Sequence, residues 1–298
     1  MKNNMSAGKR VWRIIYPILI YIACQYVVQF AYIFVKMFDY LKIYGIETAM
    51  SESGMLEITD KLLGDILNDT LIITLTCNLL VIGVLFAVYM NDKKKTEAEN
   101  PLHLNTVRSP LTYFLNVSVS ASSCIVGNIF LSYIVAIAVA VFGENITASY
   151  DYVADAIGNS NVALQLFCVV LIGPIAEELL MRGIVFKRLR SGMNAFGAAV
   201  ISSCIFGLIH GNWVQFIYAF IIGIIAAYIY EFTRNLAAPI VFHIVANGIS
   251  TVASQQSLSP YFENMMFGVT MSLTVLLCLT SIITGLTGMK LISDKYKN

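Results

Sequence analysis

Apolar runs long enough to cross a lipid bilayer recur along almost the whole chain. A bilayer core about 30 Å thick needs about 20 apolar residues per helix. The sequence offers eight candidates, at about 14–37, 70–90, 111–142, 162–186, 192–211, 213–231, 237–253 and 265–288. We therefore predict an all-α fold, a polytopic membrane helix bundle of about eight transmembrane helices.

The composition excludes an ordinary soluble protein. Only 12% of the 298 residues are charged and 58% are hydrophobic, with a mean hydropathy of +0.74. Soluble domains carry about 25% charged residues, and so few charges could not cover the surface of a packed soluble chain of this size. The net charge of +1 gives no overall basic field that would attract nucleic acid.

The cysteines point to neither disulfides nor a cysteine-based zinc site. Each lies inside an apolar run, and no two have a C-x-x-C spacing. We interpret them as small apolar residues buried in helices. They are Cys24, Cys77, Cys124, Cys168, Cys204 and Cys278.

The basic residues predict how the chain is oriented. Most of the 19 Lys and Arg residues fall in the N-terminus, in alternate loops and in the C-terminal tail, whereas the loops 143–161 and 254–264 contain none. Cytoplasmic loops are enriched in Lys and Arg. We therefore expect a multi-pass protein of the cell membrane with both termini in the cytoplasm.

Three charged residues interrupt the fourth apolar run. Glu177, Glu178 and Arg182 lie where an ionisable side chain costs roughly 2.5–3.5 kcal/mol on insertion scales. Glu178 and Arg182 are four residues apart and face each other on a helix, whereas Glu177 points about 100° away. The segment is thus either part of a functional site or a salt bridge at a helix end near the membrane surface.

Two of the three histidines also lie in apolar runs. His210 ends one run, and His243 lies in another, four residues before Asn247, while His103 falls in a charged loop and is expected to be solvated. Counting helical rise from the predicted turns puts Glu177, His210 and His243 near mid-depth. These groups could form one polar cavity, or they could be structural hydrogen-bonding residues between helices.

This set of residues suits hydrolysis. A carboxylate and a neutral imidazole can hold and deprotonate a water, and a second imidazole with a carboxamide can donate hydrogen bonds to an oxyanion. No serine or cysteine nucleophile pattern occurs, and the H-E-x-x-H motif is absent. No cofactor is expected to be required, although Glu177, His210 and His243 could in principle supply three zinc ligands.

These motifs resemble those of a known family. Glu177-Glu178-x-x-x-Arg182, Phe206-x-x-x-His210 and His243-x-x-x-Asn247 are similar to the three motifs of the CAAX prenyl protease and bacteriocin-processing family of intramembrane glutamic endopeptidases. The resemblance covers about 162–253. It implies that Glu177 and His210 activate the attacking water, that Glu178 and Arg182 form a structural pair, and that His243 and Asn247 form the oxyanion site.

The resemblance also suggests a division of the chain. We expect an N-terminal transmembrane region at 1–161 with an external loop at 38–69, a protease core at 162–253, and a last transmembrane helix with a cytoplasmic tail at 254–298. Within the external loop, apolar residues between Met55 and Leu67 recur at helical spacing, which predicts a short amphipathic helix on the outer surface.

The predicted partners are a membrane-associated peptide or protein substrate and the lipid bilayer, but no nucleic acid. A non-enzymatic alternative stays open, namely a bacteriocin self-immunity protein or a transport protein that uses the polar cavity for binding. Replacement of Glu177 distinguishes these classes, because a protein that only binds should keep its function without this carboxylate.

Overall fold

The computed structural model describes residues 6–99, 109–158, 160–253 and 269–297. Helices account for nearly all of these residues, and no strand occurs within those ranges. The predicted all-α class is therefore confirmed. In chain order the elements are α1 Ala7–Tyr44, α2 Ile46–Ala49, α3 Glu52–Asn68, α4 Thr70–Glu99, α5 Pro110–Phe142, η2 Glu144–Ile146, α6 Ala148–Gly158, α7 Val162–Gln165, η3 Leu166–Ile172, α8 Gly173–Glu178, η4 Leu179–Phe186, α9 Lys187–Arg190, α10 Ala195–Ile209, α11 Trp213–Thr233, α12 Ala237–Ala253 and α14 Val269–Lys297.

Each of the eight predicted spans coincides with a helix or with one continuous helical run. In the described part of the chain, six are long and apolar enough to cross a membrane: α1, α4, α5, the run 162–190, α11 and α14. The other two, α10 and α12, are apolar but shorter, at 15 and 17 residues. The chain is a multi-pass helical membrane protein.

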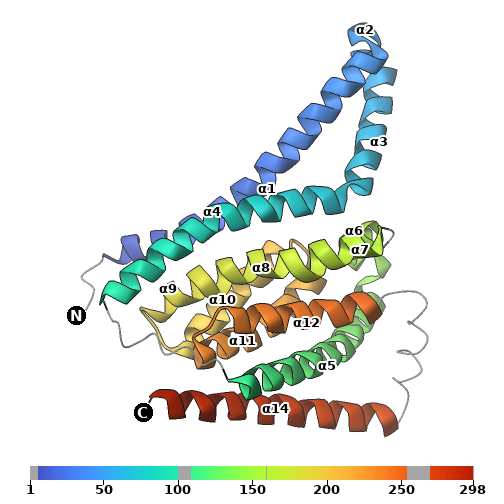
Figure 1. Ribbon diagram of the computed structural model, residues 1–298. Coiled ribbons are helices and arrows are strands. Elements are labelled where there is room, and N and C mark those ends of the chain that lie inside the picture. The colour runs from blue at the N-terminus through green and yellow to red at the C-terminus, as the bar shows by residue number, and fades with distance from the viewer. Residues whose placement is uncertain (1–5, 100–108, 159, 254–268, 298) are drawn as a thin grey trace.

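The run 162–190 occupies the middle of the bundle. Its α8 and η4 segments contact α4 on one side, while η3 and α8 contact α12 on the other (Figure 1). Around η4, residues such as Leu180, Met181 and Ile184 are fully or almost fully buried in an apolar core that also includes residues of α1, α4, α10 and α11. Glu178 is therefore enclosed by helices from both halves of the chain, and Glu177 lies at the edge of this core.

A polar ladder fixes α12 against α5. Asn116 Nδ2 donates to the Ala238 carbonyl at 2.7 Å, Ser120 donates to the Phe242 carbonyl, and Cys124 Sγ lies 3.4 Å from the Ala246 carbonyl. The donors are four residues apart on α5, and so are the acceptors on α12. The two helices therefore run parallel and contact each other along one face of each. Such hydrogen bonds help hold helices together in membranes, and here they set the rotation of the helix that carries His243.

The predicted external loop at 38–69 is helical almost throughout. Residues 38–44 continue α1, and α3 contains the predicted amphipathic helix. In Figure 1 the C-terminal half of α1 and α3 project away from the bundle and meet at α2. The apolar run of α1 ends at Met37, but its helix continues to Tyr44, and the external position of 38–69 stays a prediction.

Ion pairs and tyrosine hydroxyls join α3 to α1. Lys36 Nζ lies 3.0 Å from Asp65 Oδ2, and Tyr40 donates to the same oxygen at 2.7 Å. These hydrogen bonds, the Tyr40 contact foremost, lower the pKa of Asp65 below its ordinary value. These contacts bind α3 along the end of α1.

The predicted C-terminal tail is helical as well, since α14 continues to Lys297. His103 lies outside the described residues, as does the predicted loop 254–264.

Candidate active site

Glu177 and Glu178 lie in a helical run whose hydrogen-bonding pattern changes on either side of them. The flanking segments η3 and η4 are π-helical, and α8 between them is α-helical. The Gly173 N–H bonds to the Cys168 carbonyl five residues earlier, directly before Pro174, which has no N–H to donate. Short π-helical segments are rare and are frequent at functional sites.

Glu178 and Arg182 form the ion pair that their spacing predicts. Arg182 Nη1 lies 2.8 Å from Glu178 Oε1, and both side chains are 0% exposed. Arg182 Nη2 also donates to the Gly223 carbonyl of α11 at 2.6 Å, and the guanidinium lies over the Phe206 ring. The alternative of a helix-end salt bridge near the surface is wrong, because the pair is enclosed by α8, α10 and α11.

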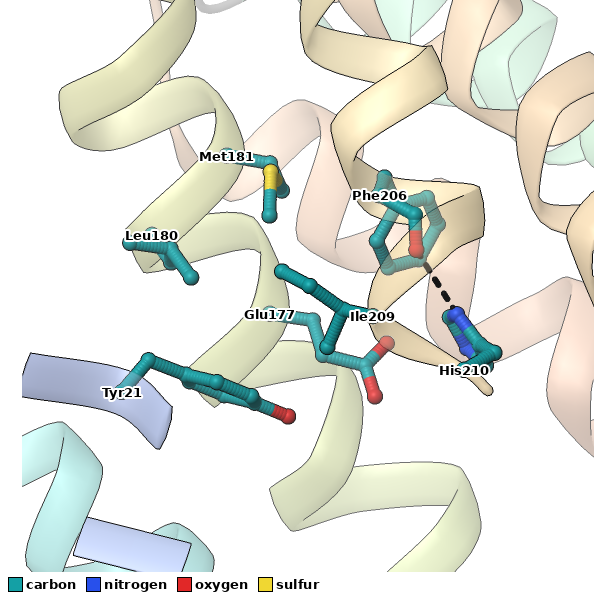
Figure 2. A pocket seen from close by; sticks show the side chains of 7 residues that line it. All are labelled: Tyr21, Glu177, Leu180, Met181, Phe206, Ile209 and His210. Atoms are coloured by element: carbon teal, nitrogen blue, oxygen red, sulfur yellow. Dashed lines mark hydrogen bonds between the residues drawn. The ribbon is translucent and has the colours of Figure 1, made fainter. Parts of the chain in front are cut away.

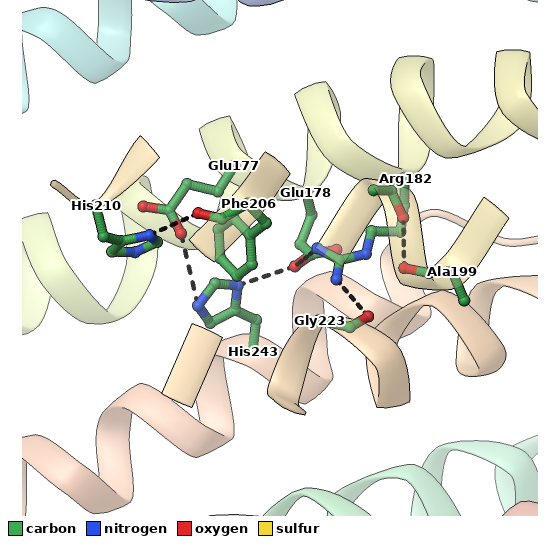
Figure 3. Close-up of polar contacts among 9 residues, drawn as sticks. Glu177, Glu178, Arg182, Ala199, Phe206, His210, Gly223 and His243 are labelled. Atoms are coloured by element: carbon green, nitrogen blue, oxygen red, sulfur yellow. Dashed lines mark hydrogen bonds and ion pairs between the residues drawn. The ribbon is translucent and has the colours of Figure 1, made fainter. Parts of the chain in front are cut away.

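His243 lies between the two glutamates (Figure 3). Its Nδ1 is 2.9 Å from Glu178 Oε1, and its Nε2 is 3.6 Å from Glu177 Oε2. Glu178 is paired with Arg182 and its carboxylate can only accept, so we assign the proton at this contact to Nδ1 of His243. The imidazole is almost completely buried and is oriented by Glu178.

His210 is oriented by the backbone of its own helix. It follows the last residue of α10, and Gly211 adopts a φ of +74°, which allows the chain to turn sharply into α11. The His210 Nδ1 lies 2.8 Å from the Phe206 carbonyl oxygen. Because a carbonyl can only accept, Nδ1 carries the proton, and the neutral ring presents Nε2 as an acceptor.

Glu177 and His210 line the same small cavity. Its volume is about 70 Å³, and Figure 2 shows the Glu177 carboxylate between Tyr21 and His210. The other lining residues are mostly apolar: Tyr21, Leu180, Met181, Phe206 and Ile209. The predicted meeting of Glu177, His210 and His243 is thus confirmed, since the first two share a cavity and the third contacts Glu177.

Asn247 lies one turn after His243 on α12 but is not among the residues that line this cavity. Its Nδ2 donates to the Val169 carbonyl of η3 at 3.0 Å. The carboxamide carries a second N–H, so one donor is used for the contact with η3 and another remains.

The comparisons with known proteins match the part of the chain that contains these residues. Residues 159–249 match the family described as Type II CAAX prenyl endopeptidase Rce1-like. The matched segment is thus similar in sequence to CAAX prenyl endopeptidases. It contains Glu177, Glu178, Arg182, His210, His243 and Asn247.

Two curated relatives resemble part of the chain. YdiL of Bacillus subtilis (strain 168), a membrane peptidase by name, is 29% identical over 137 residues, which cover 42% of this chain and 56% of YdiL. The membrane-embedded CAAX protease MroQ of Staphylococcus aureus (strain USA300) is 30% identical over 97 residues, covering 30% of this chain and 39% of MroQ. The chain thus spans about half the length of these relatives or less. No solved structure matches it.

The three possible zinc ligands Glu177, His210 and His243 do not form a metal-binding group among the residues that the structure describes. In the part of the chain described here, no three His, Cys, Asp or Glu side chains converge as a metal site. Glu177 and His243 face each other, with 3.6 Å between Oε2 and Nε2, and His210 lines the cavity beside Glu177 without completing a group of three ligands.

Sequence reasoning missed several groups that surround the CAAX prenyl endopeptidase motifs. Tyr21 reaches the cavity from α1, far outside the family segment, and the carbonyls of Gly223 and Val169 bind Arg182 and Asn247. Tyr21 is one of 16 tyrosines and belongs to no motif. Backbone carbonyls leave no trace in the sequence, so only the packing of the helices could reveal them.

Proposed function

We propose that the chain is an intramembrane endopeptidase that hydrolyses a peptide bond of a membrane-associated protein or peptide. The observation that carries the proposal is the cavity that Glu177 and His210 share within the CAAX prenyl endopeptidase segment. The names of the two relatives, a membrane peptidase and a CAAX protease, support the same class of reaction.

Glu177 and His210 are suited to hold the attacking water. The Glu177 carboxylate and Nε2 of His210 are both acceptors, so one water can donate a hydrogen bond to each while its oxygen lone pair stays free. As the water oxygen attacks the carbonyl carbon, Glu177 takes one of its protons. The apolar walls of the cavity strengthen this interaction, because charges attract protons more strongly where bulk water is excluded.

His243 and Asn247 are suited to bind the oxyanion. The carbonyl electrons move onto the oxygen as the new carbon–oxygen bond forms, and donors placed there lower the barrier. Since Nδ1 of His243 donates to Glu178, its Nε2 can donate as well only when the ring is cationic. Both glutamates lie beside the imidazole, Glu178 at Nδ1 and Glu177 at Nε2.

The tetrahedral intermediate then collapses, and the proton held by Glu177 passes to the leaving group. The carbon–nitrogen bond breaks, and the departing amine takes the proton that Glu177 removed from the water. The products are an amine and a carboxylic acid that still carries the second proton of the water, and this acid ionises to a carboxylate by releasing that proton to solvent. Glu177 returns to its ionised form. Glu178 and Arg182 hold His243 in place throughout and exchange no proton with the substrate.

We further propose that the protein lies in the cell membrane with both termini in the cytoplasm and the α2–α3 segment outside. The support is the alternation of Lys and Arg along the sequence, which places the basic ends of α1, α4 and α9 on one side.

The proposal is tested by comparing the peptides of cells that carry wild-type protein or the Glu177→Gln variant. Glu47→Gln is the matched control, because Glu47 is an exposed glutamate of α2. We expect one or a few membrane-associated fragments to disappear only in Glu177→Gln. Identical peptide profiles, together with an intact phenotype in that variant, would indicate a binding protein of the immunity or transport class.

A further inference from the structure

The cavity beside Glu177 has one wall that comes from outside the family segment. Tyr21 of α1 lines it together with Leu180, Met181 and Ile209. Figure 2 shows the Tyr21 side chain reaching across from α1 toward Glu177, with its hydroxyl at the leading end. The N-terminal region thus supplies part of the candidate active site.

The Tyr21 side chain is held in this position. It is 7% exposed and packs in the same buried core as Leu180 and Met181. Its hydroxyl is hydrogen-bonded to the Gln25 side chain, one turn further along α1. The hydroxyl therefore has a partner on its own helix, and the side chain as a whole limits the cavity.

A buried charged cluster also fixes α1 to the helical run that carries Glu177. Arg188 of α9 donates to Asp92 of α4 at 2.6 Å and to the Tyr16 hydroxyl of α1 at 2.7 Å, and it also donates to the Arg13 carbonyl. Arg188 and Asp92 are 8% and 7% exposed. Tyr16 lies little more than one turn before Tyr21, so α1 forms a fixed wall at this point.

The size of the cavity restricts what can enter it. A volume of about 70 Å³ exceeds the roughly 10–15 Å³ that one water needs by the same measure and is about half of the ~150 Å³ cavity that accepts benzene. With the attacking water in place, the space between Glu177 and Tyr21 leaves more room for a short aliphatic side chain than for an aromatic ring.

We propose that Tyr21 is a specificity-determining residue, which forms the wall of a side-chain subsite next to Glu177 and limits that subsite to small residues of the substrate. The inference rests on the proposed peptidase function and deepens it. Replacing Tyr21 by Ala removes the ring and enlarges the subsite, whereas Tyr21→Phe keeps the ring and with it the preference for small side chains.

The test uses quenched fluorescent peptides that are identical except for Ala, Val, Leu or Phe at each position around the cleaved bond. Wild-type protein, Tyr21→Ala, Tyr21→Phe and Tyr26→Ala are compared in proteoliposomes. Tyr26 is the matched control, because it lies on the same helix but is 56% exposed. At one position, wild type, Tyr21→Phe and Tyr26→Ala should favour Ala over Phe in kcat/KM by at least roughly tenfold.

Tyr21→Ala should reduce this preference to less than about threefold, mainly by accepting the larger peptides. An unchanged preference in Tyr21→Ala would overturn the inference while leaving the peptidase function standing. Equal loss of cleavage of all peptides in Tyr21→Phe would also overturn it, because the hydroxyl rather than the size of the ring would then matter.

A second measurement does not depend on turnover. In Glu177→Gln protein without native cysteines, Tyr21→Cys and Tyr26→Cys are labelled with a membrane-permeant maleimide in the presence of the same peptides. The small-residue peptides should protect position 21 and leave position 26 unprotected. Protection without any hydrolysis by the wild type would refute the proposed function alone, whereas hydrolysis without protection at position 21 would refute the subsite.

Discussion

The imidazole of His243 is hydrogen-bonded to the buried carboxylate of Glu178, with 2.9 Å between Nδ1 and Oε1. This contact joins the two motifs that the sequence separates by 65 residues. It gives Glu178 two partners, since the same oxygen accepts from Arg182. Glu178 therefore supports the site by orienting His243 as well as by neutralising Arg182, while the adjacent Glu177 faces the cavity.

Glu178→Gln should lower stability more than Glu177→Gln. The glutamine leaves Arg182 as a buried charge without its carboxylate, and breaking such a pair costs about 3–5 kcal/mol. Glu177 borders a cavity and its side chain is 23% exposed, so its amide variant should fold nearly normally. Thermal unfolding in detergent measures the difference. A larger loss of stability in Glu177→Gln would mean that the two roles are reversed.

Substitutions of His243 and Asn247 distinguish oxyanion binding from zinc ligation. Asn247→Ala should lower turnover by roughly 10²–10³ with little effect on substrate affinity, because an oxyanion donor acts in the transition state. His243→Gln should lose less activity than His243→Ala, because the glutamine keeps a donor of similar reach.

Zinc would give a different pattern. His243→Gln would then be nearly as damaging as His243→Ala, and a chelator would inactivate the purified protein until zinc was restored. Cleavage rates of these variants and elemental analysis of the purified protein provide the check. Stoichiometric zinc with chelator-sensitive activity would overturn the glutamate mechanism and leave the protease class intact.

The α5–α12 ladder should affect catalysis through His243. Ser120→Ala removes the hydrogen bond to the Phe242 carbonyl, directly before His243. Interhelical hydrogen bonds in membranes contribute about 0.6 kcal/mol on average and up to about 1.7 kcal/mol, so unfolding should become easier by this amount and cleavage should slow. Ser132→Ala is the control, since Ser132 is exposed and bonds only within α5. Equal effects of the two variants would show that the ladder does not position His243.

Cysteine labelling tests the proposed topology. In protein without native cysteines, Lys94→Cys should react with an impermeant maleimide only after the cells are opened, and Glu47→Cys should react in intact cells. Labelling of Lys94→Cys from outside intact cells would reverse the orientation.

The fold was largely predictable because the constraint of the bilayer acts on continuous sequence. Inside the bilayer every backbone N–H and C=O group needs a hydrogen-bond partner, and a helix supplies these partners within one segment. The continuation of α1 past its apolar run was not predictable, because it is held there by contacts of Lys36 and Tyr40 with Asp65. Such pairings between helices are invisible to a count of apolar residues.

The site was predictable in its motifs but not in its contacts. Four-residue spacing correctly indicated the pairing of Glu178 with Arg182, because helical geometry is local. The bridge from His243 to both glutamates depends on how α12 packs against α8, which the α5 ladder helps to set. The position of Tyr21 depends on the docking of α1, so no spacing rule could reveal it.

The most direct test of the central claim is hydrolysis by purified protein in proteoliposomes. Wild-type protein and Glu177→Gln are given the same identified membrane peptide, and mass spectrometry measures the two products at single turnover. We predict cleavage by the wild type and none by a folded Glu177→Gln variant, because an amide cannot take the proton from water. Cleavage by folded Glu177→Gln at a rate near that of the wild type would contradict the account.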